Sequence, residues 1–484
     1  MSVETILCPV RVNTESRPDV PALITSEKTW SWAELDELVS STAAHLNEMA
    51  PPGSRIAVQM PNSPELVALI LAALRTGHVL ALISTRLPEN DVETARKQIR
   101  ADLFTNLSHT PTRPHAHTQD IPSPPHPLTT SPSDPLGARA TYISPLPHVT
   151  ILPIPLTRPA TITYTSGSAG TPKAALHTVG SHVWSARGLA EALPLAQEDR
   201  WLLNLPLYHV SGLAIVYRCA LAGAAVVLPG HEMSTGEAIR AFGVTHSSLV
   251  AAQLYRLLRE DFAVNTLKAI LLGGSAISPG LLAAASERSL PIHTSYGLTE
   301  MASTVSVTSA FISTLELASS GRPLPHRELA IRDGEIQVRG RTRFTGYVEG
   351  KQLIQPFDDQ GWFATGDLGY MDETGCLHVA GRTDNQFVSG GENIQPEEIE
   401  AALNALSGVV QAIVVPVADD EFGQRPVAFV QMEDELDPQA IRTSLEATLP
   451  RFKLPVAIYP WPTLAGMKPS RTALQREAEV RNAR

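Results

Sequence analysis

Cysteine is scarce in this chain. The three cysteines, Cys8, Cys219 and Cys376, are far apart, odd in number and outside any metal-ligand spacing. This pattern argues against a disulfide framework and against a cysteine-based zinc site. We therefore expect reduced thiols in a cytoplasmic protein.

Long hydrophobic runs are also lacking. The first eleven residues include Glu4 and no sustained apolar run, so we expect no signal peptide. The longest apolar stretch, residues 66–83, is interrupted by Arg75 and His78. It favours a buried helix followed by a strand over a membrane span.

Positive charge is in the minority. The 38 lysines and arginines face 49 aspartates and glutamates, for a formal net charge of −11. Because nucleic acid requires a basic face, we expect small-molecule partners and no nucleic acid. The net negative charge does not exclude a local basic pocket. The composition is that of a globular protein, and the 484 residues suggest roughly three domain-sized units. Composition and length are both compatible with a homo-oligomer.

Short apolar runs alternate with longer periodic segments along the first 300 residues or so, which predicts an α/β fold with a mainly parallel sheet. Ser31 and Glu34 have capping-box spacing for the first long helix. Expected strands are 22–24, 55–59, 201–205, 224–228, 247–250 and 269–272. Expected helices are 32–49, 64–75, 177–193, 213–221, 236–242 and 253–259.

Residues 108–159 are rich in proline, histidine, threonine and serine. Proline removes backbone donors and blocks helices, which predicts a long exposed connection. A metal site is the alternative, but the histidines lack regular ligand spacing and cysteine partners. They are His109, His115, His117, His126 and His148.

The last third of the chain changes pattern again. Between 321 and 382, short strands separated by turns predict a small β-barrel or sheet, and the last hundred residues predict a compact α+β unit. We thus expect an N-terminal domain over 1–383, made of two α/β subdomains and a β-barrel part at about 321–383. A small mobile domain is expected over 384–484.

The segment Thr163–Lys173 combines hydroxyls, glycines and one lysine. Glycines let backbone N–H groups converge on an anion, and lysine offsets its charge, so this loop suits phosphate. It is not a P-loop, because Thr171 and Pro172 separate Gly170 from Lys173. A Ser/Gly surface loop is the alternative. Further polar turns follow expected strands at 205–212, 273–275 and 296–300, where open α/β sheets gather ligands.

Taken together, these turns resemble the adenylate-forming superfamily of acyl-CoA synthetases, adenylation domains and luciferases over nearly the whole chain. The matching segments are Thr165–Lys173 (phosphate loop), Tyr296–Glu300 (adenylate motif), Thr365–Asp367 (ribose), Gly381–Asp384 (hinge), Ser389–Asn393 and Gly466–Arg471 (catalytic lysine). Four more segments resemble the o-succinylbenzoate:CoA ligases of menaquinone biosynthesis. They are Leu205–Gly212, Leu271–Gly274, Asn385–Glu392 and Val415–Asp419.

The resemblance implies a ligase that uses ATP, Mg²⁺ and coenzyme A. A carboxylate is first joined to AMP with loss of pyrophosphate, and a thiol then attacks the acyl carbon. Such in-line displacement depends on alignment and charge stabilisation and requires no protein nucleophile. The alternatives are another aryl or medium-chain acyl-CoA synthetase, or a catalytically silent nucleotide- or acyl-binding relative.

The same resemblance assigns the ATP site, with Asp367 on the ribose and Glu300 and Thr165 on the metal. The alternative for Asp367 is a turn aspartate, and the alternative for Glu300 is a solvated acid at the start of a helix. The alternative for Arg382 is a surface salt bridge. The ATP-binding set is Thr165, Ser166, Gly167, Ser168, Gly170, Thr171, Lys173, Gly273, Gly274, Ser275, Tyr296, Gly297, Thr299, Asp367 and Arg382.

The remaining roles concern acid, thiol and domain movement. Lys468 is implied as the catalytic lysine, although Met467 separates it from the glycine that many relatives place directly before it. His209 is implied at the acyl site, as a catalytic and substrate-binding residue, with a packing histidine as the alternative. The hinge is implied at Asp384 and the coenzyme A tunnel at Gly390 and Gly391, with a flexible turn as its alternative.

Arg218 stands alone in an apolar helix, where a buried arginine needs an anion. We expect it to bind the second carboxylate of o-succinylbenzoate, while an internal acidic partner is the alternative.

Overall fold

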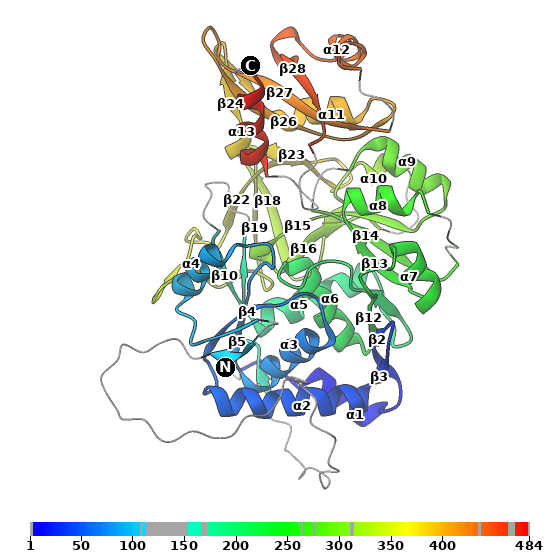
Figure 1. Ribbon diagram of the computed structural model, residues 1–484, viewed down its shortest axis with the longest axis vertical. Helices are drawn as coiled ribbons and strands as arrows, with labels where there is room; N and C mark the ends of the chain where they lie inside the picture. The colour runs from blue at the N-terminus through cyan, green and yellow to red at the C-terminus, as the bar shows by residue number, and fades with distance from the viewer. Residues whose placement is uncertain are drawn as a thin grey trace, which may run out of the picture.

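The computed structural model describes residues 3–106, 109–112, 153–165, 172–260, 262, 265–274, 277–309, 314–433, 437–462 and 470–482. The N-terminal elements lie at one end of the molecule and the last hundred residues form a separate lobe at the other (Figure 1). Most of the Pro- and His-rich segment falls outside the described residues. Its described ends are strands, β7 (His109–Thr112) and β8 (Ile154–Pro155), and β8 pairs with β1 (Thr5–Ile6).

One eight-stranded sheet is built from segments far apart in sequence. Its order is β21 (Gln352–Ile354), β20 (Gly346–Glu349), β10 (Ala174–Thr178), β9 (Pro159–Tyr164), β5 (Val79–Leu82), β4 (Arg55–Gln59), β6 (Leu103–Asn106) and β7. The strands from β9 to β6 are parallel, as the alternating sequence pattern predicts. The late strand β20 pairs with β10 and extends this early sheet.

A nine-stranded sheet forms the second half of the large lobe. Its order is β17 (Arg322–Pro323), β16 (Ser303–Val307), β15 (Ile292–Leu298), β14 (Ala269–Leu272), β13 (His246–Leu249), β11 (Arg200–Leu202), β12 (Ala225–Leu228), β2 (Pro21–Thr25) and β3 (Thr29–Ser31). It is parallel from β15 to β2.

Helices fill the space around both sheets. One hydrophobic core contains residues of both sheets and of α1 (Pro9–Ser16), α2 (Trp32–Met49), α3 (Pro64–Thr76), α5 (Val179–Ala192) and α6 (Val210–Ala222). The opposite face of the eight-stranded sheet packs on α4 (Glu89–Ile99). The opposite face of the nine-stranded sheet packs on α7 (Thr235–Phe242), α8 (Ala251–Leu257) and α9 (Pro279–Glu287), beside α10 (Thr314–Leu317). These layers confirm the predicted α/β class.

Local signals fix some boundaries well and others less well. The predicted capping box is present, because Ser31 Oγ accepts from the N–H of Glu34 at 3.2 Å and the Glu34 carboxylate accepts from the N–H of Ser31 at 2.9 Å. Helix α5, in contrast, begins later than expected. His177 belongs to β10, and Thr178 caps the helix by accepting from the N–H of Ser181 at 3.1 Å.

The segment expected to be a barrel divides between two sheets. Four antiparallel strands form one sheet: β18 (Arg327–Arg332), β19 (Glu335–Gly340), β22 (Phe363–Met371) and β23 (Leu377–Arg382). Strands β20 and β21 instead join the eight-stranded sheet. Two short 3₁₀ turns complete this part of the chain: η1 (Thr299–Met301) connects β15 and β16, and η2 (Thr383–Asn385) follows β23.

The C-terminal lobe is an α+β unit with its own hydrophobic cores. Its elements are β24 (Phe387–Ser389), β25 (Glu392–Ile394), α11 (Pro396–Asn404), β26 (Val409–Asp419), β27 (Gly423–Met432), α12 (Pro438–Glu446), η3 (Arg451–Lys453), β28 (Ala457–Pro460) and α13 (Arg471–Asn482). None of the helices in the described ranges is long and apolar enough to cross a membrane.

Candidate functional site

The phosphate-type loop connects two strands of one hairpin. Strands β9 and β10 are antiparallel neighbours, and the N–H of Thr165 donates to the carbonyl of Lys173 at 3.0 Å, which closes the base of the loop. Its flanks therefore differ from the strand-to-helix turn of a P-loop. Its central residues lie outside the described part of the chain, as do two other predicted site residues. These are Ser166, Gly167, Ser168, Gly170 and Thr171, together with Ser275 and Lys468.

Glu300 sits in the 3₁₀ turn η1, half-buried between the two large sheets and the four-stranded sheet. The hydroxyl of Tyr347 donates to Glu300 Oε1 at 2.5 Å, and the N–H of Phe344 donates to the Glu300 carbonyl at 2.7 Å. Burial raises the pKa of this carboxyl, against the opposing hydrogen bond from Tyr347. The turn is anchored on its other side by His177, whose Nε2 lies 2.7 Å from the carbonyl of Thr299.

Tyr347 is a site residue that the sequence did not single out. Its ring lies beneath Lys173, with the ammonium 5.1 Å from the ring centroid, while its hydroxyl meets Glu300. It thus links the phosphate-type loop to the adenylate motif. Only the pairing of β20 with β10 brings Tyr347 here, and nothing in the local sequence predicts that pairing.

Asp367 and Arg382 face each other across neighbouring strands β22 and β23. Arg382 Nη1 donates to Asp367 Oδ1 at 2.9 Å, and the Tyr296 hydroxyl donates to Asp367 Oδ2 at 2.5 Å. Asp367 is 9% exposed, and burial raises its pKa even though both partners favour the charged form. Three residues predicted to contact ATP therefore form one hydrogen-bonded group around Asp367. Two of them, Tyr296 and Asp367, are 71 positions apart in sequence.

A side chain is disfavoured at each of the predicted glycines, for a different structural reason. A Cβ on Gly273 would lie 2.9 Å from Ser295 Oγ, and Gly274 has a left-handed φ of +83°. A Cβ on Gly297 would lie 2.3 Å from the carbonyl oxygen of Ser303 on the adjacent strand β16. Gly297 is therefore required by strand packing whether or not a nucleotide lies beside it.

Arg218 is buried on α6 at 4% exposure. Its Nη2 donates to Ser303 Oγ and Thr304 Oγ1, each at 3.3 Å, and the guanidinium lies 5.2 Å from the Trp201 ring centroid. Burial lowers its pKa to about 10. Nε has no hydrogen-bond partner, and within the described ranges no carboxylate forms an ion pair with Arg218. The alternative of an internal acidic partner therefore finds no support there.

His209 precedes α6 as its N-terminal cap residue, nine positions before Arg218, and is exposed. A rise of about 1.5 Å per residue separates their Cα atoms by roughly 13 Å along the helix axis. The His209 ring centroid lies 4.7 Å from that of Tyr208, and partial desolvation lowers the pKa of His209, so the ring contacts protein on one side and solvent on the other. The structure thus places His209 at the N-terminal end of α6 and Arg218 on a buried face in the second half of the same helix.

The predicted hinge directly follows β23, at the start of the C-terminal lobe, and the predicted thiol loop lies within that lobe. Asp384 is in η2, and its carboxylate accepts from Arg382 Nε at 2.8 Å. Gly390 and Gly391, both with left-handed φ, form the turn between β24 and β25. The N–H of Gly390 donates to the carbonyl of Phe422 at 2.9 Å, so this hairpin packs against the turn between β26 and β27 of the same lobe.

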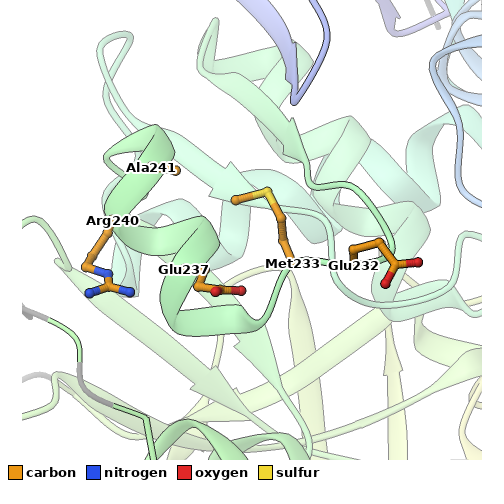
Figure 2. Close-up of a pocket in the computed structure, with 5 residues that line it drawn as sticks. All are labelled: Glu232, Met233, Glu237, Arg240 and Ala241. Atoms are coloured by element: carbon orange, nitrogen blue, oxygen red, sulfur yellow. The ribbon is translucent and has the colours of Figure 1, made fainter.

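A separate surface depression lies beside α7 (Figure 2). None of the predicted site residues lines it. Its lining residues are Glu232, Met233, Glu237, Arg240 and Ala241.

Comparisons with protein families agree with this geometry. The model of the AMP-binding enzyme family matches residues 10–348, and that of the AMP-binding enzyme C-terminal domain matches residues 398–466. A 2-succinylbenzoate–CoA ligase of Escherichia coli (strain K12) is 38% identical over 473 residues, which cover 95% of each chain. The ligase of that name in Bacillus pumilus is 32% identical over 458 residues, 91% of each chain.

Solved structures show the same similarity. An arginine-to-lysine variant of Escherichia coli MenE with bound OSB-AMS has a TM-score of 0.81 and 32% identity, covering 99% of this chain and all of that one. The Bacillus subtilis o-succinylbenzoate CoA synthetase, in complex with the acyl-adenylate intermediate OSB-AMP, has a TM-score of 0.81 at 25% identity and covers 99% of both chains.

Proposed function

This chain belongs to the AMP-binding enzyme family, and from that membership we propose that it is an ATP-dependent acid–thiol ligase for o-succinylbenzoate. A carboxylate oxygen of the acid attacks the α-phosphorus of ATP, and pyrophosphate leaves. The thiol of coenzyme A then attacks the acyl carbon of the adenylate, and AMP leaves with the bonding electrons. The products are o-succinylbenzoyl-CoA, AMP and pyrophosphate.

The observation that carries the choice of acid is Arg218. A buried guanidinium without a carboxylate partner in the described ranges is unfavourable unless an anion joins it. o-Succinylbenzoate has two carboxylates, and adenylation uses one. The second carboxylate supplies the missing anion, with Ser303 and Thr304 hydroxyls beside the same guanidinium.

We propose that the ATP site is the group formed by Tyr296, Asp367 and Arg382. Asp367 accepts hydrogen bonds from the Tyr296 hydroxyl and from Arg382, and ribose hydroxyls are donors of the same kind. Arg382 then lies beside both ribose and phosphate. The loop that ends at Lys173 holds the pyrophosphate as it leaves.

The side chain of Glu300 fits a magnesium ion. Mg²⁺ is usually held by one or two carboxylates together with substrate phosphates, and the described residues contain no cluster of three or more metal-binding side chains. The half-buried Glu300 carboxylate, with Thr165 at the base of the phosphate loop, would hold it. Bound there, Mg²⁺ neutralises phosphate charge. Tyr347 orients Glu300 for that contact.

We propose that the lobe after residue 383 moves between the two half-reactions. Asp384 lies in the interval between the two family matches, of which the first ends at residue 348 and the second begins at residue 398. One orientation presents Lys468 to the reacting carboxylate and α-phosphate, where it stabilises the accumulating negative charge. The other presents Gly390 and Gly391 to coenzyme A, whose thin thiol arm passes where side chains are absent. His209 lines the acyl pocket from its mouth.

Pyrophosphate release across a panel of acids tests this function. With ATP and Mg²⁺, we expect o-succinylbenzoate to give the highest kcat/KM, ahead of benzoate, medium-chain fatty acids and the two keto acids that each lack one of its carboxylates. A monocarboxylate that exceeds it would point to a different acyl-CoA synthetase. Release from none of the acids would indicate a silent binding protein.

Tyr347→Phe tests the support of Glu300. The substitution removes one hydroxyl but keeps the ring under Lys173, so we expect about a fivefold higher Mg²⁺ concentration for half-maximal rate, the effect of one lost hydrogen bond of ~1 kcal/mol. Mg²⁺ titrations of pyrophosphate release measure it. Tyr370→Phe is the matched control, because Tyr370 is exposed. An unchanged Mg²⁺ dependence in Tyr347→Phe would remove this role from Tyr347.

A further inference from the structure

The turn that follows Glu300 has an unusual backbone. Ala302 and Ser303 have φ values of +52° and +101°, in the left-handed region that non-glycine residues rarely adopt. Both residues are buried, and Ser303 begins β16. Such a conformation persists only where its surroundings hold it in place.

Two residues from other elements hold this turn. Ser185 on α5 donates its hydroxyl to the Ala302 carbonyl at 2.6 Å. Arg327, at the start of β18, donates from Nη2 to the Ser185 carbonyl at 3.1 Å and to its hydroxyl oxygen at 3.3 Å. Arg327 Nη1 also donates to the Pro325 carbonyl at 2.8 Å. Arg327 therefore fixes Ser185, and Ser185 fixes the turn.

The other side of the turn meets Arg218. Ser303 Oγ accepts from Arg218 Nη2 at 3.3 Å, so a continuous chain of contacts runs from Arg327 through Ser185, Ala302 and Ser303 to Arg218. If the turn relaxed to an ordinary backbone, Ser303 Oγ would move away from Arg218. The direction of the Arg218 guanidinium thus depends on Ser185 and Arg327.

This series of contacts has an arginine at each end, Arg327 and Arg218, and neither positive charge has an acidic partner among the described residues. Arg327 is 6% exposed, and within the described residues it forms no ion pair with an acidic side chain. Burial and the nearby charge of Arg218 lower its pKa to about 9. A structural cross-link between carbonyl groups needs no charge, and a buried charge without a counter-ion is costly. A second positive charge near Arg218 favours a bound anion.

We propose that Ser185 and Arg327 are positioning residues that orient Arg218 and determine selectivity for dicarboxylic acids over monocarboxylic acids. This inference rests on the proposed function, because it assigns the free carboxylate of the acid to Arg218. Neither residue is expected to touch ATP or the reacting carboxylate.

Ser185→Ala and Arg327→Met test the inference in the full chain. We expect the KM for o-succinylbenzoate to rise about tenfold, equivalent to ~1.4 kcal/mol. The kcat and the KM for ATP should change less than about twofold. The same limit applies to the KM of a monocarboxylate analogue that keeps the carboxylate to be adenylated and lacks the one assigned to Arg218. This analogue is whichever of 4-oxo-4-phenylbutanoate and 2-butanoylbenzoate the enzyme adenylates. Arg327→Lys keeps the charge but loses the two-donor geometry, and it should recover part of the loss.

Ser181→Ala is the matched control. Ser181 is a buried serine one turn earlier on α5, and its hydroxyl donates to the carbonyl of Arg343 and not to the turn. It should leave the ratio between dicarboxylate and monocarboxylate unchanged. Equal changes for both classes of acid in Ser185→Ala would show a merely structural role and overturn the inference.

Calorimetric binding of o-succinylbenzoate without ATP separates this inference from the proposed function. Wild-type protein that binds the acid but does not adenylate it would contradict the function alone. Equal Kd values for wild-type and Ser185→Ala would contradict the inference alone, and no binding by the wild type would contradict both. If Arg327→Met fails to fold, Ser185→Ala and Arg327→Lys give the same readouts.

Discussion

Lys468→Ala is expected to lower acyl-adenylate formation by about 10²–10³-fold, the range found when a group that stabilises transition-state charge is removed. Negative charge from the carboxylate and the α-phosphate meets at the reacting centre, and Lys468 is the residue proposed to offset it. Pyrophosphate release with ATP and o-succinylbenzoate measures this half-reaction. Conversion of supplied acyl-adenylate and coenzyme A to thioester should stay close to the wild-type rate.

The control for this substitution is Lys97→Ala. Lys97 lies on α4 with 76% of its side chain exposed, so its loss should alter neither half-reaction. A variant of Lys468 that loses both half-reactions equally would show that this lysine supports the lobe as a whole. A variant that keeps adenylation would remove it from the chemistry altogether.

Arg218→Met is expected to raise the KM for o-succinylbenzoate by about 30-fold or more, since losing one partner of a buried charge pair typically costs ~2–5 kcal/mol. Methionine keeps much of the buried volume but removes the charge. The KM for ATP should be unchanged, because the proposed nucleotide contacts come from Tyr296, Asp367 and Arg382. Steady-state kinetics with both substrates varied measures the split.

A stability measurement strengthens that test. In the ligand-free protein Arg218 has no acidic partner within the described ranges, so Arg218→Met breaks no ion pair there and should not lower the midpoint of thermal unfolding by more than a few degrees. Addition of o-succinylbenzoate should then raise this midpoint in the wild type but not in the variant. Arg256→Met, at an exposed position on α8, serves as the control. Unchanged dicarboxylate kinetics in Arg218→Met would refute the pairing.

Much of the fold is readable from periodicity. The helix Trp32–Met49 has the bounds that its capping box and apolar spacing predict, and strands Arg55–Gln59 and Ala269–Leu272 lie where expected. Errors occur where a short apolar run allows either structure. His177 is expected at the start of a helix but lies in β10, because pairing with β9 decides the outcome and local propensity does not.

The site is predictable where its chemistry is local and hidden where it depends on distant pairing. Asp367 and Arg382 were expected from short motifs, and the structure brings them into contact. Tyr347, Ser185 and Arg327 carry no such motif. Each becomes relevant only through a partner far away in sequence, namely Glu300, Ala302 and Ser185.

The pairing of β20 with β10 has a consequence for synthesis of the chain on the ribosome. Until Gly346–Glu349 has emerged, β10 is the outer strand of its sheet, with one row of N–H and C=O groups unpaired. Every strand of the nine-stranded sheet is made before that point, because β17 precedes β20 in sequence. The nascent chain therefore carries an open edge at β10 from the synthesis of Thr178 until that of Gly346–Glu349, and during this interval β10 can pair with a strand of a neighbouring chain.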